Sequence, residues 1–323
     1  MNLAFAGFRH GHIFALYDMA KKNPEVTITG CYEENEPARR TAQETTGGDF
    51  CYATYEAVLN DPAVDAIAIG DYYQKRGQLI IQALRHGKHI ICDKPLCTSL
   101  EELDEIERLA EEKNLQVCCM LDLRYLPQVR KAKELIESGE LGEIHNISFT
   151  GQHPLDYGNR PAWYFEPGKH GGTINDIAIH GIDLVRLLTG KDLTKVHCAR
   201  TWNAFADKEP DFPDCAQFMV EMGGTSVMAD VSYAAPSYLL PTYWDFYFWG
   251  TKGMMNFRLS ETTIHLYRST EEIIDCPAET DEMMADFLKE IGGETTRMAT
   301  KETLASQRQT LKIQKIADLT RFR

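Results

Sequence analysis

The stretch that decides the fold is "DAIAIGDYYQKRGQLIIQALRHGKHIICDKP", residues 65–95. It starts with an apolar run (65–70), continues with a segment whose apolar residues recur at helical spacing (75–87), and ends with a second apolar run (89–92). Gly87 stands where a helix C-cap belongs. Two apolar strands joined by an amphipathic helix predict a parallel sheet with both faces covered.

The same alternation extends on both sides of this stretch. Ser99 is followed three residues later by Glu102, which is a capping box and predicts a helix start. We therefore predict that residues 1–121 form one α/β domain with a doubly wound parallel sheet, whose ligands bind at the carboxyl ends of the strands. The other elements expected here are strands at 3–7, 26–32 and 116–121 and helices at 12–22, 36–47 and 99–114.

After residue 121 the pattern changes to strands linked by short turns such as Gly223-Gly224. Residues 122–323 are predicted to form an α+β domain with a large, mostly antiparallel, open-faced sheet, and its last helices are free to pack back on the first domain. The strands expected are 144–151, 195–203, 215–222, 225–233, 243–250, 254–258 and 263–267, and the helices 127–138, 173–190, 280–292 and 300–319.

The composition narrows the class of protein. The chain has 323 residues, a net charge of −14 and 43% hydrophobic residues, which is typical of a soluble globular protein. Because nucleic acids and anionic membranes select clustered Lys and Arg, neither is an expected partner. The beginning of the chain lacks the features of a signal peptide. The nine cysteines lack C-x-x-C spacing, so we expect a cytoplasmic protein with no disulfide and no metal.

"GFRHGH" (7–12) lies where a dinucleotide-binding turn belongs. It matches G-x-G-x-x-G poorly, because only Gly7 fits, while Arg9 and His12 occupy the second and third glycine positions. A generic strand-to-helix turn is the alternative interpretation. We assign Gly7, Phe8, Arg9, His10 and His12 to the cofactor site, where Arg9 and the two histidines would donate hydrogen bonds to phosphate or face the nicotinamide.

Glu33 follows the second predicted strand, 26 residues beyond Gly7. A carboxylate at about this distance grips a ribose 2′-hydroxyl in dinucleotide-binding folds and would repel a 2′-phosphate. Glu33 therefore favours NAD over NADP. The alternative is that Glu33 is one of the 48 acidic residues on a solvated loop.

With these motifs in hand, the chain resembles the glucose–fructose oxidoreductase / inositol dehydrogenase / MocA family. The resemblance implies a Rossmann domain followed by an open-faced sheet domain. It also implies hydride exchange between a nicotinamide cofactor and a sugar, polyol or related hydroxyl compound, with Lys94, Asp176 and His180 as the catalytic set. The stretches that carry it are "GKHIICDKPL" (87–96), "LRYLPQVRKAKELIESGELGEI" (123–144), "GGTINDIAIHGIDLVRLLTG" (171–190) and "WGTKGMMNF" (249–257).

Two segments depart from the family pattern. Asp93 replaces the Glu of its E-K-P motif. Where the family has T-P-x-x-x-H, Asp71-Tyr72 stand for the Thr-Pro and Arg76 for the His. These four residues, together with Lys94, complete the expected cofactor site.

Oxidation of a secondary alcohol needs a hydride acceptor and a group that takes the hydroxyl proton. Asp176 and His180 are spaced i, i+4, so a helix places them on one face. His180 would take the proton, Asp176 would bind a hydroxyl or stabilise the imidazolium, and Lys94 would stabilise the alkoxide charge. The alternative for His180 is that it is an ordinary histidine of the protein interior, and for Asp176 that it binds nearby backbone. For Asp183 the alternative is a structural role.

The long segment 151–172 leads directly into the predicted helix 173–190. Its Trp163 and Tyr164 would stack on a sugar ring, although loop packing or a subunit contact is an equal alternative. Arg124 and Asn175 are also assigned to the substrate side.

Three functions agree with these residues. The first is an NAD-dependent dehydrogenase of a carbohydrate or polyol. The second cleaves a glycoside by transient oxidation and elimination, and the third is a non-catalytic sugar- or dinucleotide-sensing protein. An exposed sheet face needs a cover, so we expect a homodimer or homotetramer.

Overall fold

The computed structural model describes residues 1–236, 244–278 and 282–320. Packing divides the chain into two compact units, and each is described by itself. The first unit comprises Met1–Leu121, Pro161–Gly171 and Glu282–Gln307, and the second comprises Asp122–Arg160, Gly172–Asp281 and Arg308–Arg323.

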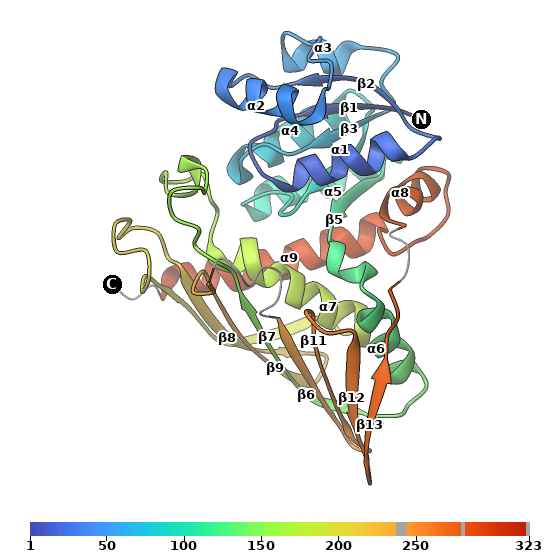
Figure 1. Cartoon of the computed structure of the whole chain (residues 1–323), viewed down its shortest axis with the longest axis vertical. Coiled ribbons are helices and arrows are strands. Elements are labelled where there is room, and N and C mark those ends of the chain that lie inside the picture. The colour runs from blue at the N-terminus through green and yellow to red at the C-terminus, as the bar shows by residue number, and fades with distance from the viewer. Residues whose placement is uncertain (237–243, 279–281, 321–323) are drawn as a thin grey trace. The chain divides into compact units, whose positions relative to one another are not determined.

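The first unit is built on a five-stranded parallel sheet with the order β2-β1-β3-β4-β5. The helices that follow the strands surround this sheet (Figure 1). The predicted doubly wound Rossmann architecture is therefore confirmed. Its strands are β1 (Asn2–Ala6), β2 (Thr27–Tyr32), β3 (Ala66–Ile69), β4 (His89–Asp93) and β5 (Val117–Met120), and its helices include α1 (His12–Lys22), α2 (Glu36–Thr46), α3 (Tyr55–Asn60), α4 (Tyr73–Arg85), α5 (Leu100–Lys113) and α8 (Met283–Ile291).

Local sequence signals explain these elements. All four residues of β3, the run "AIAI", are buried, as expected for an inner strand of a covered parallel sheet. The side chain of Ser99 accepts a hydrogen bond from the N–H of Glu102 and caps α5. Helix α3 was not predicted. It is only six residues long and begins at Thr54, whose hydroxyl accepts from the N–H of Ala57.

The second unit contains an eight-stranded sheet with the order β13-β12-β11-β10-β6-β9-β8-β7. Only β6 and β9 pair in parallel among the strands of residues 122–236 and 244–278, so the mostly antiparallel sheet is confirmed. The strands are β6 (Ile144–Gln152), β7 (Leu193–Trp202), β8 (Cys215–Met222), β9 (Thr225–Ser232), β10 (Asp245–Gly250), β11 (Met254–Arg258), β12 (Thr263–Tyr267) and β13 (Glu271–Asp275).

One face of this sheet carries a row of aromatic side chains. Phe246 pairs with Phe149 across one strand boundary and with Phe257 across the next. The rings stack with centroids 5.6 and 5.2 Å apart. Gly181 packs on Phe149 so closely that a Cβ there would lie 2.2 Å from the ring. Figure 1 shows α6 (Pro127–Glu137) and α7 (Ile179–Thr189) along this sheet.

Two details differ from the sequence predictions. The predicted helix 173–190 is a π-helical turn, η3 (Ile174–Ala178), followed by α7. β13 was missed, because "EEIID" is mostly exposed and lacks apolar alternation. Residue 243 of the predicted strand 243–250 and residues 280–281 of the predicted helix lie outside the described residues. α9 (Thr300–Leu319) has the predicted bounds. Among the described residues, no helix is both long and apolar enough to span a bilayer.

Candidate active site

The turn between β1 and α1 is fixed by neighbouring strand ends. Gly7 has φ +81°, and a Cβ there would lie 2.7 Å from the Asp71 Cβ, so only glycine fits. The N–H groups of Arg9 and His10 both donate to the carbonyl of Gly70, at 3.1 and 3.2 Å. The β1 turn therefore lies directly on the turn that follows β3.

Glu33 joins this turn to the end of β2. It is 3% exposed, and its Oε2 accepts from the N–H of Phe8 at 2.6 Å while Oε1 accepts from Asn35 at 2.8 Å. Burial raises the pKa of Glu33, although these two backbone donors oppose the shift. The structure thus gives Glu33 a role in shaping the turn, and its predicted ribose contact stays a prediction.

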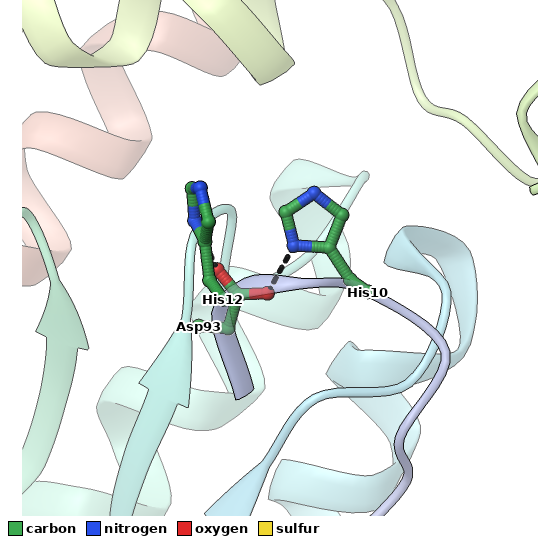
Figure 2. Close-up of side chains that lie close together, drawn as sticks. All are labelled: His10, His12 and Asp93. Atoms are coloured by element: carbon green, nitrogen blue, oxygen red, sulfur yellow. Dashed lines mark hydrogen bonds and ion pairs between the residues drawn. The ribbon is translucent and has the colours of Figure 1, made fainter. Parts of the chain in front are cut away.

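A buried charge network lies at the carboxyl end of β4 (Figure 2). Asp93 is fully buried. Its Oδ2 lies 2.5 Å from His10 Nδ1 and 2.8 Å from Arg76 Nη2, and its Oδ1 lies 3.1 Å from His12 Nδ1. The chain positions that depart from the family motifs therefore contact one another.

The surroundings set the protonation of this network. Burial opposes the charge of Asp93, but Arg76, His10 and His12 together hold its pKa well below the usual range. Burial lowers the pKa of His10 from 6.5 to about 4, in spite of the attraction of Asp93. Asp93 is therefore ionised and His10 neutral near neutral pH.

The donor atoms of His10, His12 and Asp93 lie within 4.8 Å of one another, as in a metal site. The contacts nevertheless have hydrogen-bond lengths, and the guanidinium of Arg76 already binds Asp93. A divalent ion would have to displace these bonds beside a buried positive charge. We therefore do not assign a metal to this cluster.

Arg76 is fully buried and supports the DKP turn from inside. Its Nη1 donates to the carbonyls of Asp93, Lys94 and Pro95, at 2.9, 2.5 and 3.1 Å, and its Nε donates to that of Asp71. This differs from the predicted cofactor contact, because every one of these bonds is to the chain itself and no surface is left for a ligand. Arg76 instead positions Lys94, which is 3% exposed.

Tyr72 directly precedes α4, and three cationic side chains lie near its ring. Lys169, Arg9 and Lys75 lie 5.0, 5.7 and 5.9 Å from the centre of its ring. Lys75 also binds Asp71 at 2.9 Å. The predicted residues Asp71, Tyr72 and Arg9 are thus brought together at one edge of the first unit.

Trp163 and Tyr164 pack inside the first unit. Each is 2% exposed. The Trp163 indole donates to the carbonyl of Arg9 at 3.0 Å, and the Tyr164 hydroxyl lies 2.7 Å from that of Tyr73, which bonds His10 Nε2 at 3.1 Å. The predicted stacking on a sugar ring has no support here, because both rings are covered by protein. The burial of both rings agrees with the alternative interpretation, which was loop packing.

In the second unit, η3 and α7 present the predicted acid and base. Asp176 is 3% exposed and accepts a hydrogen bond from the hydroxyl of Tyr233. His180 is 5% exposed, with its Nδ1 3.7 Å from Asp122 Oδ1 and its ring 5.8 Å from that of Trp244 in an edge-to-face arrangement. Tyr233, which follows β9 directly, was not predicted, because nothing in the local sequence marks it as a partner of Asp176.

Gln314 of α9 fixes the start of η3. Its Oε1 accepts from the N–H groups of Ile174 and Asn175, at 2.9 and 3.1 Å. Gly172 allows this approach, since a Cβ there would lie 2.2 Å from the Gln314 side chain. Asn175 is fully buried, and its substrate role stays a prediction.

Arg124 forms a buried bidentate pair with Asp183. Its Nε lies 2.7 Å from Oδ2 and its Nη2 lies 2.5 Å from Oδ1. Arg124 and Asp183 are each 2% exposed. Asp183 therefore has the structural role that was its alternative interpretation, and the pair links η1 (Asp122–Tyr125) to α7.

The β1 turn suits a dinucleotide. The N–H groups of Gly11 and His12, at the start of α1, donate no backbone hydrogen bond within the described residues. A Cβ at Gly11 would meet no atom within 4 Å, so the space beside the turn is open. Open N–H donors at a helix N-terminus bind the pyrophosphate in such folds.

The fold and the β1 turn together are those of a dinucleotide-binding domain. Residues 1–120 match the family model described as "Oxidoreductase family, NAD-binding Rossmann fold". Residues 129–256 match the "GFO/IDH/MocA C-terminal domain". The chain belongs to the Gfo/Idh/MocA family, and the resemblance seen in its sequence is confirmed.

Two curated relatives illustrate the family. The chain is 31% identical to levoglucosan dehydrogenase of Pseudarthrobacter phenanthrenivorans over 57% of its own length and 45% of that protein's. It is 32% identical to scyllo-inositol 2-dehydrogenase (NAD(+)) of Bacillus subtilis, over 62% of its own length and 57% of that protein's. The chain thus spans about half the length of these relatives.

Solved structures support the fold alone. A protein from Erwinia carotovora atroseptica SCRI1043 has a TM-score of 0.90 over 100% of both chains, at 22% identity. A 3-ketoreductase from Actinomadura kijaniata, solved with NADP, has a TM-score of 0.79 over 99% of this chain and 97% of that one, at 18% identity. An oxidoreductase from Agrobacterium radiobacter, solved with NAD+, L-tartaric acid and magnesium, has a TM-score of 0.79 over 96% and 94%, at 20% identity.

Proposed function

We propose that this chain is an NAD(P)-dependent oxidoreductase that acts on a secondary hydroxyl of a sugar, cyclic polyol or related compound. The observation that carries the proposal is the pair of Asp176 and His180, which η3 and α7 hold four residues apart in the chain and nearly fully buried. An imidazole can take the proton of a substrate hydroxyl, and a carboxylate near it in the chain can bind a second hydroxyl or stabilise the imidazolium. The dehydrogenase names of the curated relatives support the same reaction class.

The chain's own residues have distinct tasks in this proposal. The nicotinamide, when bound, supplies the hydride acceptor or donor. His180 takes the proton of the substrate hydroxyl as a general base. Asp176, held by Tyr233, binds a neighbouring hydroxyl or stabilises the imidazolium. Lys94 stabilises the developing alkoxide charge, and Arg76 fixes the backbone from which Lys94 extends.

The cofactor is proposed to be NAD rather than NADP. Glu33 and Glu34 follow β2, and carboxylates there disfavour a 2′-phosphate. The relatives do not separate the two cofactors, since neighbouring structures hold NAD+ in one case and NADP in another.

The test is a turnover assay on the full chain with NAD+ or NADP+ and a panel of sugars and inositols, followed by the absorbance of the reduced nicotinamide. Lys94→Met should lower kcat by about 100- to 1,000-fold, and His180→Asn by a similar factor. Lys21→Met is the control, because Lys21 is an exposed residue of α1.

Two outcomes would contradict the dehydrogenase assignment. Release of an aglycone without accumulation of reduced cofactor would support glycoside cleavage by transient oxidation. Dinucleotide binding with no turnover of any substrate, and with both variants indistinguishable from the unmodified protein, would support a sensing role.

A further inference from the structure

His12 has two ring nitrogens in different surroundings. Its Nδ1 bonds Asp93 Oδ1 (Figure 2), and the two atoms are 3.1 Å apart. Its side chain is 36% exposed, and within the described residues no protein group bonds its Nε2. His12 is also the first residue of α1, beside the open N–H groups of the turn.

The network determines which nitrogens carry hydrogen. Asp93 is ionised, so its oxygens only accept, and each histidine must present Nδ1–H to it. His10 Nε2 accepts from the Tyr73 hydroxyl at 3.1 Å, which completes the bonding of a neutral ring. His12 differs, because its Nε2 can gain a proton while Nδ1–H stays on Asp93.

The position of His12 in the β1 turn gives a proton on Nε2 a role in ligand binding. In a conventional turn the third glycine stands here and allows close packing of helix and strand beside the pyrophosphate. This chain has an imidazole instead, and it ties that imidazole to Asp93, which Arg76 holds in turn. A side-chain donor of fixed orientation thereby joins the open N–H groups of the turn.

Charge favours an imidazolium when a phosphate is near. The groups that face His12 are Asp93 from β4, His10 from the turn and, across Asp93, Arg76 from α4. With both histidines neutral, the charges of Arg76 and Asp93 cancel. One proton on His12 makes the cluster positive, which a dianionic pyrophosphate stabilises and Asp93 supports from the other side.

We propose that His12 recognises the pyrophosphate of the dinucleotide as an imidazolium, so that binding takes up one proton from solvent and release returns it. The inference rests on the proposed dinucleotide-binding function and assigns it a specific, pH-linked contact. The step involves no bond other than N–H at Nε2 and no other reactant.

The experiment is calorimetric titration of the full chain with NADH, NADPH, ADP-ribose and AMP, from mildly acidic to mildly alkaline pH, in buffers of different ionisation enthalpy. NADH and ADP-ribose should bind with uptake of close to one proton. Their affinity should fall by up to about tenfold per unit of pH once the free protein is neutral at His12, as linkage of one proton requires. AMP lacks a pyrophosphate, and its own phosphate loses its last proton at about pH 6. The comparison is therefore made at alkaline pH, where the affinity of AMP should not fall with pH.

Matched variants show which residue takes up the proton when the dinucleotide binds. His12→Gln keeps a neutral donor and should bind NADH with an affinity that no longer depends on pH. His197→Gln is the control, because His197 lies in the second unit and its side chain is also 36% exposed; its pH dependence should equal that of the unmodified protein. Circular dichroism checks that both variants fold, and the comparison of ADP-ribose with AMP needs no variant.

The outcomes separate this inference from the proposed function. Dinucleotide binding that is independent of pH, or proton uptake that persists in His12→Gln, overturns the inference alone. So does an affinity that EDTA abolishes and zinc restores, because the cluster would then hold a metal. If neither NADH nor NADPH binds at any pH, the proposed function falls, and this inference with it.

Discussion

Asp93 is the residue at which the unusual features of the first unit meet. A glycine-poor turn would be loosely held by backbone alone, but here two of its side chains bond one buried carboxylate. Arg76 supplies the opposite charge that makes this burial tolerable. A replacement at any one of these positions therefore affects the others, because they share the same two oxygen atoms.

Removal of Arg76 tests this dependence. Arg76→Met leaves the buried carboxylate without its cation, so we expect a loss of about 3–5 kcal/mol in the free energy of unfolding of the first unit. Arg40→Met is the control, since Arg40 and its partner Glu36 have side chains 70% and 67% exposed, and it should cost less than about 1 kcal/mol. Chemical unfolding measures both, and equal losses would show that the network contributes nothing special.

His10 makes stability depend on pH. Burial lowers its pKa from 6.5 to about 4, so the unfolded chain binds this proton first as the pH falls. Its contribution is complete above about pH 6.5 and is lost towards pH 4, a change of about 3 kcal/mol. His10→Asn keeps a donor for Asp93 but cannot titrate, so unfolding midpoints between pH 7 and 4 should fall less steeply in this variant. His197→Asn should retain the original slope, and a His10→Asn profile parallel to the unmodified protein would refute the assignment.

At the scale of elements, sequence periodicity located most helices and strands. The bounds of β12 and α9 match the predictions. β12 alternates in burial, and α9 is a long run of residues without Gly or Pro. The π-helical turn η3 could not be foreseen, since it depends on Gln314, 139 residues from Asn175 in the chain, binding two N–H groups. The i, i+4 argument for Asp176 and His180 assumed a regular α-helix, and η3 changes that geometry at Asp176.

The close contact of two turns gives a prediction for the β1–α1 element. Gly7 and Gly47 both have positive φ, +81° and +65°, but only Gly7 has neighbours where a Cβ would lie. Gly47→Ala should cost about 1 kcal/mol from backbone strain alone. Gly7→Ala adds a clash with Asp71 and should cost about 3 kcal/mol or more, with weaker dinucleotide binding. Denaturant midpoints and NADH titrations of the two variants provide the comparison. Equal midpoints would mean that the turn accommodates the Cβ at Gly7 without further loss of stability.

At the scale of the whole molecule, the candidate site divides into parts that the sequence could and could not supply. Residues at the carboxyl ends of β1, β3 and β4 were expected to share one edge of the sheet, and Gly7, Asp71 and Asp93 do so. That Arg76 lies beneath this edge depends on packing, which no local pattern reveals. The place of Trp163 within the first unit could not be predicted either. An aromatic residue in a loop gives the same sequence signal whether it packs inside the protein or stacks on a sugar.

One face of the eight-stranded sheet carries exposed apolar side chains. Met219 and Met228 pair across β8 and β9 and are 37% and 50% exposed, and Trp249 of β10 is 47% exposed. Met219, Met228 and Thr320 help to line a hollow of about 680 Å³ whose walls are mainly apolar. Exposed apolar faces of this kind mark association sites, which supports the proposed homo-oligomer.

Charges on this face should disrupt that association. In the double variant Met219→Glu/Met228→Glu, like charges lie opposite each other on the exposed face, so the dissociation constant of the oligomer should rise by about tenfold or more. Phe205→Glu is the control, because Phe205 is 53% exposed but lies in a loop rather than on the sheet. Sedimentation velocity over a concentration series measures the effect. A monomeric unmodified protein, or an oligomer that the double variant leaves intact, would show that this face serves another purpose.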